Sequence, residues 1–218
     1  MRKFVTIVFL FFLFTITSFS QNGYGTEVNG NIVLPIGKNA EDYSIGFGGL
    51  VGFYYDVAEN FRLALVLGYL RVSINEDKIN GDFTSGGQTG NLNVSGGIGA
   101  IPAILSLRFI SPGPGMRLYG LLEGGLYTYR TSISGTYTIG SDPPLNVDKS
   151  EFRSEPGVAF GGGVLFPLNT ELSLDVNVRY HWIRDSEYLN YGSGNSIANS
   201  RLLSLGVGVN WFFPLKQN

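Results

Sequence analysis

The chain has 218 residues, of which 15% are charged, 14% are aromatic and 31 are glycine, and its formal net charge is −2. Soluble domains have roughly 25% charged residues, so this low fraction, with a mean hydropathy of +0.12, indicates that much of the surface avoids water. The charge lacks the basic excess that nucleic-acid binding requires. Because cysteine is absent, the sequence excludes disulfides, thiolate metal sites, a cysteine nucleophile and lipid attachment at cysteine.

The first 20 residues have the features of a secretory signal peptide. Met1–Lys3 is a short basic segment, residues 4–16 form an apolar run, and Ser18 and Ser20 are the small residues that signal peptidase recognises. We expect cleavage after Ser20, which leaves residues 21–218 as one exported domain. An uncleaved membrane anchor is the alternative, but the apolar run is shorter than the ~20 residues that span a bilayer.

After residue 20, bulky apolar residues alternate with small or polar ones. This alternation predicts strands almost throughout, because successive side chains of a strand point to opposite faces. The expected strands span residues 24–34, 45–56, 61–74, 93–110, 116–132, 153–168, 171–184 and 201–213. Pro102 has no N–H to donate to a ladder, so a bulge is expected there.

The connections between these strands alternate in length. Long connections at 35–44, 75–92, 133–152 and 185–200 alternate with short turns at 57–60, 111–115 and 169–170. Outer-membrane barrels have an even number of strands, short periplasmic turns and long outer loops. We therefore predict an all-β, eight-stranded antiparallel up-and-down transmembrane β-barrel. Strands longer than the roughly 9–11 residues that cross hydrocarbon are expected to project above the membrane as a wall.

These features resemble those of the small outer-membrane β-barrel family, the eight-stranded group that includes the OmpA transmembrane domain, OmpX and OmpW. The resemblance covers essentially the whole chain after residue 20. It implies a place in the cell outer membrane, contact with outer-membrane lipid and insertion by the outer-membrane barrel insertion machinery. A soluble ligand-binding barrel is the structural alternative, which would bury the bulky face and expose the glycine-rich, charged face.

The family also implies an assembly signal at the C-terminal end, where a polar residue, a glycine and two hydrophobic or aromatic residues follow at fixed spacing. The matching residues are Gly208, Trp211 and Phe213, with Gly206 in place of the polar residue. A second, overlapping match is Ser204, Gly206, Val209 and Trp211. Residues 214–218 extend past the point at which such barrels usually end.

The inward face of the expected barrel collects charged side chains. They are Glu27, Arg62, Arg108, Glu123, Asp175, Arg179 and His181. An unpaired ion in a narrow lumen costs several kcal/mol, so we expect these groups to pair and to occlude most of the lumen. The alternative is a gated, porin-like channel for small solutes, in which the pairs exchange partners.

A third hypothesis is an enzyme that modifies lipid A, because the family includes such barrels. One group of them uses a His–Ser pair and a carboxylate on the outer wall. Here His181 is the only histidine, Ile183 stands two positions later, and Ser173 on the same face is eight positions away. A nucleophile needs its base within hydrogen-bond reach. We therefore expect no enzymatic activity and no metal or other cofactor.

The bulky face carries aromatic residues near the strand ends. They are Phe53, Tyr69, Tyr180, Trp182, Trp211 and Phe213. We interpret them as the aromatic girdle of a membrane interface, with Trp211 and Phe213 on the periplasmic side and Tyr69, Tyr180 and Trp182 on the outer side. A sugar-stacking set is the alternative.

The third and fourth long connections contain Tyr137, Tyr188 and Tyr191 among Gly, Ser and Asn, a composition suited to adaptable binding. We therefore predict a structural or surface-interaction role, with an extracellular ligand or surface partner at these loops. Loops without a partner are the alternative interpretation.

Overall fold

The computed structural model describes residues 23–37, 40–85, 87–140, 142–184 and 201–214. The expected signal peptide, residues 1–20, and the expected fourth loop, residues 185–200, lie outside this part of the chain. Within it, no helix combines the length and the apolar character needed to cross a membrane.

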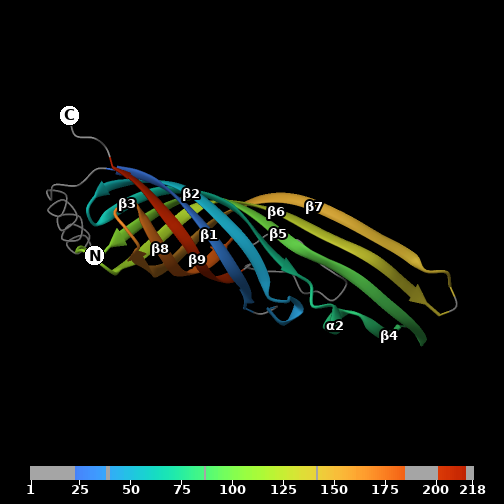
Figure 1. Cartoon of the computed structure of the whole chain (residues 1–218). Helices are drawn as coiled ribbons and strands as arrows, with labels where there is room; N and C mark the ends of the chain where they lie inside the picture. Colours follow the sequence, from blue (N-terminus) through green and yellow to red (C-terminus); the bar gives the residue numbers. More distant parts are fainter. Residues whose placement is uncertain (1–22, 38–39, 86, 141, 185–200, 215–218) are drawn as a thin grey trace, which may run out of the picture.

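Eight strands form a closed antiparallel ring (Figure 1). They are β1 (Gly23–Ile36), β2 (Gly46–Ala58), β3 (Phe61–Ser73), β5 (Gln88–Ile110), β6 (Arg117–Ile139), β7 (Leu145–Pro167), β8 (Leu172–Ile183) and β9 (Arg201–Pro214). Strands that follow one another in the ring pair with each other, and the β1–β9 and β3–β5 ladders close it. The predicted eight-stranded up-and-down barrel fold is confirmed.

Three short elements lie outside this ring of the described chain. They are η2 (Ala40–Asp42), α2 (Glu76–Ile79) and β4 (Gly81–Ser85). Strand β4 pairs with β5 alone, so the predicted long connection at 75–92 contains a helical turn and a β-hairpin.

The two ends of the barrel differ. At one end, which we name the turn end, the short connections 59–60, 111–116 and 168–171 join the strands, and Gly23 pairs with Pro214. At the opposite end, β5, β6 and β7 continue beyond the ring as a three-stranded wall, visible on the right in Figure 1. We name this the wall end.

The wall corrects the sequence interpretation of residues 88–92 and 133–152. Each of its strands has 23 residues, and the β6–β7 ladder runs without a shift to Tyr137↔Leu145. Only residues 140–144 separate β6 from β7, so the expected third loop is wrong. Only a small apolar cluster, which includes Val94 and Ile133, is buried on one face of the wall. The serine, threonine and glycine at the other positions give the same local composition as a loop.

The distribution of side chains between the inside and the outside of the barrel is the reverse of that in a soluble barrel. Exposure alternates along the strands, and large apolar side chains point outward: Phe47 is 68% exposed, and Leu118 and Val207 are more than half exposed. Charged and polar side chains point inward and are buried. The arrangement that a soluble barrel would need, with the bulky face inside, is not the one observed.

Pro102 causes no bulge. The β5–β6 ladder passes through Pro102↔Tyr127 in constant register. The β3–β5 ladder keeps the same register on both sides of the proline, from Leu67↔Ala103 to Leu70↔Ala100. The missing N–H is therefore accommodated by an interrupted ladder, and no residue is inserted. A register shift lies instead in β2, between Asp56 and Ala58.

Candidate functional site

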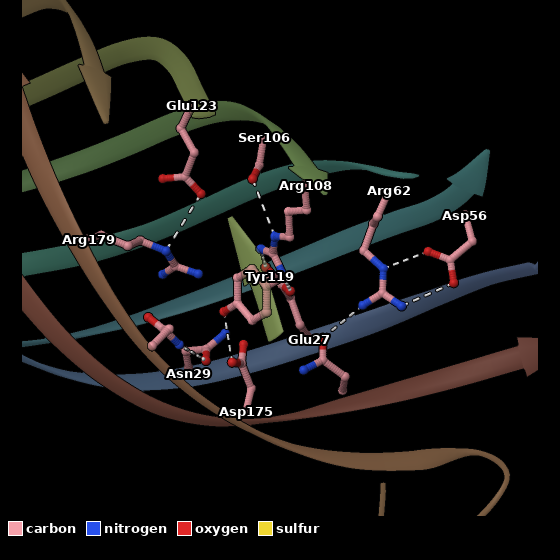
Figure 2. Close-up of polar contacts among 12 residues, drawn as sticks. Glu27, Asn29, Asp56, Arg62, Ser106, Arg108, Tyr119, Glu123, Asp175 and Arg179 are labelled. Carbon is pink, nitrogen blue, oxygen red and sulfur yellow. Dashed lines mark hydrogen bonds and ion pairs between the residues drawn. The ribbon is translucent and has the colours of Figure 1, made fainter. Parts of the chain in front are cut away.

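The interior of the barrel contains all seven side chains of the predicted charge network. Each is at most 3% exposed, and they come from β1, β3, β5, β6 and β8. The odd or even position of each residue in its strand turns its side chain inward. Figure 2 shows the six of them other than His181 close together within the barrel.

Glu27 and Arg108 form the strongest pair. Both guanidinium Nη groups of Arg108 donate to the two carboxylate oxygens of Glu27, each at 2.6 Å, which is the bidentate geometry of a strong ion pair. Arg108 Nε also donates to Ser106 Oγ at 3.4 Å. Because β1 and β5 are not neighbours in the sheet, this pair bridges the lumen (Figure 2).

Arg62 pairs with a residue that the sequence analysis missed. Its Nε and Nη2 donate to the two oxygens of Asp56 at 2.6 and 3.1 Å, and its Nη1 donates to Asn210 Oδ1 at 3.4 Å. The guanidinium carbon lies 3.6 Å from the ring centroid of Tyr54. Asp56 occupies an inward position of β2, so its place in the alternation was the available signal.

Arg179 and Glu123 form a looser pair. Their closest approach is 3.6 Å, from Arg179 Nε to Glu123 Oε1. Among the described residues, none of the three side-chain nitrogens of Arg179 has a hydrogen-bond partner. Nearby, the hydroxyl of Tyr119 donates to Asp175 Oδ1 at 2.8 Å. Asp175 therefore has a neutral donor as its hydrogen-bond partner, and Arg179 remains the least constrained charge in the interior.

His181 lies in a hydrogen-bonded chain with Tyr127 and Ser204. Its Nδ1 is 2.9 Å from the hydroxyl of Tyr127, and its Nε2 is 3.0 Å from Ser204 Oγ. Ser204 is on the neighbouring strand β9, and local spacing around His181 did not reveal it. Both His181 and Ser204 are fully buried inside the barrel. One ring nitrogen of His181 thus contacts a serine, and the other contacts a tyrosine and not a carboxylate.

Inward-facing glycines make room for these polar side chains. A Cβ on Gly52 would lie 2.7 Å from Glu27 Cγ, and a Cβ on Gly206 would lie 2.6 Å from Asn31 Oδ1 and 2.7 Å from Asn177 Oδ1. Real Cβ atoms do not approach other atoms so closely. The glycines are thus part of the packing of the network.

Toward the wall end, the interior changes from polar to apolar. The buried side chains there are Val33, Leu50, Leu70, Val72, Ala100, Ile183 and Leu202. We name this set the apolar layer. By strand position, most of its members lie nearer the wall-end opening than the Glu27–Arg108 and Arg62–Asp56 pairs do, whereas Arg179 and His181 of the network also come from the wall-end half of β8. The sequence analysis did not identify it, since these aliphatic residues carry no chemical signature.

At the turn end, a cavity of about 530 Å³ opens between the short turns. Its lining includes Tyr54, Asp56, Arg62, Arg117, Glu171 and Asn210. Because Asp56 and Arg62 belong both to this cavity and to the interior, the charge network is reachable from the turn end. Among the described residues, no group of three or more His, Asp or Glu side chains is arranged to hold a metal ion.

The aromatic residues predicted as a girdle fall into two groups at opposite ends of the barrel. At the turn end, the ring of Tyr24 lies 6.0 Å from that of Phe53 and 5.5 Å from that of Phe213, which stacks on Trp211. At the wall end lie Tyr69, Tyr180 and Trp182; Tyr69 and Trp182 are each 47% exposed. Tyr24 was not identified from the sequence.

The residues matched to the assembly signal lie along β9. Trp211 points outward and is 51% exposed, whereas Gly208 points inward against the side chain of Asn29. Tyr137, expected in a loop, lies in β6 and is partly buried. The other two loop tyrosines, Tyr188 and Tyr191, lie outside the described residues.

No protein-family model matches the chain, and no curated protein sequence matches it either. Its fold is nevertheless similar to solved outer-membrane barrels. The crystal structure of Neisserial surface protein A matches with a TM-score of 0.51 and 16% identity, over 89% of this chain and 98% of that chain. A major outer membrane protein from Thermus thermophilus matches with a TM-score of 0.52 and 16% identity, over 87% of this chain and 99% of that one. The chain therefore has the small outer-membrane β-barrel fold.

Proposed function

We propose that the protein is an integral outer-membrane barrel with a mostly occluded lumen, and that it has a structural or surface-interaction role exerted through its wall end. The observation that carries this proposal is the layered interior. The Glu27–Arg108 and Arg62–Asp56 ion pairs lie toward the turn end, and most of the apolar layer lies nearer the wall end.

The outer surface supports a place in the membrane. Leu67, Leu105, Leu126 and Val207 are each about half exposed on different strands, and a soluble protein rarely exposes a contiguous apolar surface of this kind. In a bilayer, the same side chains contact hydrocarbon. Closed barrels and helices are the two structures that satisfy every backbone hydrogen bond there.

The energetics of the interior support occlusion. Separating Glu27 from Arg108 leaves two buried charges without partners, and breaking such a buried pair costs about 3–5 kcal/mol. A path for ions would also have to pass the apolar layer, where Leu50 and Leu70 are each 1% exposed. Both features favour a closed barrel at rest.

The wall supports a surface role. Its outward face carries hydroxyl and amide side chains, including Ser95 and Ser134, whose hydroxyl oxygens are 3.5 Å apart. The ring itself does not need this projecting sheet for closure, because β7 pairs with β8 only from Gly157 onward. A hydrogen-bonding surface held away from the membrane is suited to contact a partner outside the cell.

A narrow channel is the second candidate function. It is favoured by Arg179, whose nitrogens have no hydrogen-bond partner among the described residues and which lies 3.6 Å from Glu123. Such a charge can change partners at low cost. The lipid A-modifying hypothesis has less support, because His181 and Ser204 lie inside the barrel and not on its lipid-facing wall.

Cysteine labelling of intact bacteria tests location, orientation and occlusion together, since the chain has no cysteine of its own. The variants are Ser134→Cys on the wall, Ser204→Cys in the interior and Glu171→Cys at the turn end. With a membrane-impermeant maleimide, we expect Ser134→Cys to react on intact cells, Glu171→Cys to react only after the outer membrane is opened, and Ser204→Cys to stay protected.

Two outcomes contradict the proposal. If Glu171→Cys is labelled on intact cells and Ser134→Cys is protected, the turn end faces the outside of the cell and the proposed orientation is wrong. Labelling of Ser204→Cys as fast as Ser134→Cys would show an open lumen. A gel-mobility difference between boiled and unboiled samples confirms folding of each variant before it is scored.

A further inference from the structure

Charge on the outward face of the described barrel is confined to the wall end. The arginines there are Arg71 on β3, Arg130 on β6, Arg184 directly after β8 and Arg201 on β9, all exposed. We name this set the arginine rim. The one further outward charge on these strands is Asp148, on the wall. Between the rim and the turn end, the outward positions carry apolar, glycine, threonine and proline residues.

Two arginines of the rim lie on β3 and β6, on either side of β5. Arg71 pairs with Gly99, and Gly99 pairs with Arg130, so the two arginines lie in one row of the sheet on either side of a glycine. With neighbouring strands about 4.8 Å apart, their Cα atoms are about 10 Å apart. Tyr69 covers the glycine: a Cβ on Gly99 would lie 2.5 Å from the Tyr69 hydroxyl oxygen.

These three side chains present hydrogen-bond donors without an acidic partner. Arg130 donates from Nε to Ser150 Oγ at 3.3 Å, and its guanidinium lies 5.4 Å from the Phe152 ring. These contacts orient the side chain and leave both Nη groups free of hydrogen bonds to described residues. Within the same part of the chain, neither Arg71 nor Arg130 forms an ion pair, whereas the three buried arginines each do.

The surface below this cluster specifies the rest of the ligand. Continuing toward the turn end on the same three strands, the outward residues include Leu67, Ile101 and Leu126, each about half exposed. A molecule that contacts the arginines and also lies along these side chains has an anionic head and hydrocarbon chains. Guanidinium groups match the oxygens of a phosphate in bidentate geometry.

We propose that Arg71, Tyr69 and Arg130 form a binding site for the phosphate group of an outer-leaflet lipid, whose acyl chains lie against β3, β5 and β6. The site holds the lipid at the level where the wall leaves the membrane. The other two arginines of the rim, Arg184 and Arg201, are expected to attract anionic lipids as well, since basic residues next to a membrane surface do so. This inference rests on the proposed place in the outer membrane.

Native mass spectrometry of the folded full-length mature chain in detergent tests this site. The probes are diphosphorylated lipid A and the same lipid after removal of its phosphates. We expect the wild-type chain to bind the phosphorylated form about tenfold more tightly or better, as expected for the loss of one or two charge-assisted hydrogen bonds. The Arg71→Gln, Arg130→Gln double variant is expected to lose this preference.

Arg117→Gln is the control, because it removes one arginine at the turn end, outside the proposed site. It should keep the wild-type preference. Equal binding of the two lipids by the wild-type chain, or an unchanged preference in the double variant, would overturn the proposal. Displacement of the lipid by an excess of inorganic phosphate would also overturn it, since the site would then take free phosphate. All of these positions are exposed or partly exposed on the surface, and gel mobility verifies that each variant is folded.

Discussion

At the scale of single residues, the interior of the barrel depends on a few charges that are almost fully buried. Glu27 and Arg108 are each 1% exposed and share two hydrogen bonds. The exposed pair formed by Lys78 and Glu41, at 2.9 Å, has a similar distance but lies in solvent. Burial, and not distance, sets how much stability is lost when one partner of each pair is removed.

We expect Glu27→Ala to lower the free energy of unfolding by about 3–5 kcal/mol, because it leaves the Arg108 guanidinium buried without a counter-ion. Denaturant unfolding of the protein in lipid vesicles, followed by tryptophan fluorescence, measures the change. Glu41→Ala is the control and should unfold like the wild type. If the Glu27 and Glu41 variants have the same free energy of unfolding, the Glu27–Arg108 pair does not stabilise the barrel and the prediction is wrong.

The inward glycines give a second prediction at this scale. Gly206→Ala should lower stability by about 1–3 kcal/mol, since its Cβ would overlap Asn31 and Asn177. Gly30→Ala is the matched control on the outward face, where the nearest atom would be 3.9 Å away. Unfolding midpoints of the two variants in the same vesicles should differ in that order. A stable Gly206→Ala barrel would mean that the network can move aside.

At the scale of the elements, the alternation along each strand predicted which residues face inward. It could not predict which inward side chains contact each other across the barrel. The period of two is local, so the inward positions of Arg108 and Arg179 follow from their own strands. The contact of Glu27 with Arg108 depends on side-chain direction across the lumen, and that of His181 with Ser204 depends on the register of β8 and β9. No local pattern contains that information.

The wall shows a second limit of local patterns. Residues 133–139 and 145–152 have the serine, threonine and glycine content of a loop, yet they pair in register as β6 and β7. Their strand signal is weak because only a small apolar cluster, which includes Ile133 and Val147, packs on one face of the wall. The apolar layer could not be predicted for a different reason. Aliphatic residues such as Leu50 and Leu70 occur in any strand, so they do not mark a particular layer.

We predict that shortening the β6–β7 hairpin leaves the barrel intact. Removal of residues 134–148 takes away wall residues only, because the β7–β8 ladder that closes this side begins at Gly157. The shortened chain should still fold into vesicles and show the mobility difference between boiled and unboiled samples. Failure to fold would show that the wall is part of the folding unit of the ring.

At the scale of the whole molecule, the barrel is polarised along its axis. The turn end has short connections and an open cavity of about 530 Å³, whereas the wall end has the projecting sheet, the apolar layer and the arginine rim. The fold and the number of ring strands could be predicted from the alternating connection lengths. The polarity of the interior could not, because it depends on which inward residues meet at the same depth.

The central claim is that this barrel is closed at rest, and single-channel recording in a planar bilayer tests it most directly. The purified chain is refolded, and insertion is confirmed by gel mobility before recording. We predict no discrete current steps for the wild-type protein, because ions cannot pass both the Glu27–Arg108 network and the apolar layer. Reproducible steps that change with Arg179→Ala would contradict the claim and assign the protein to the channel hypothesis.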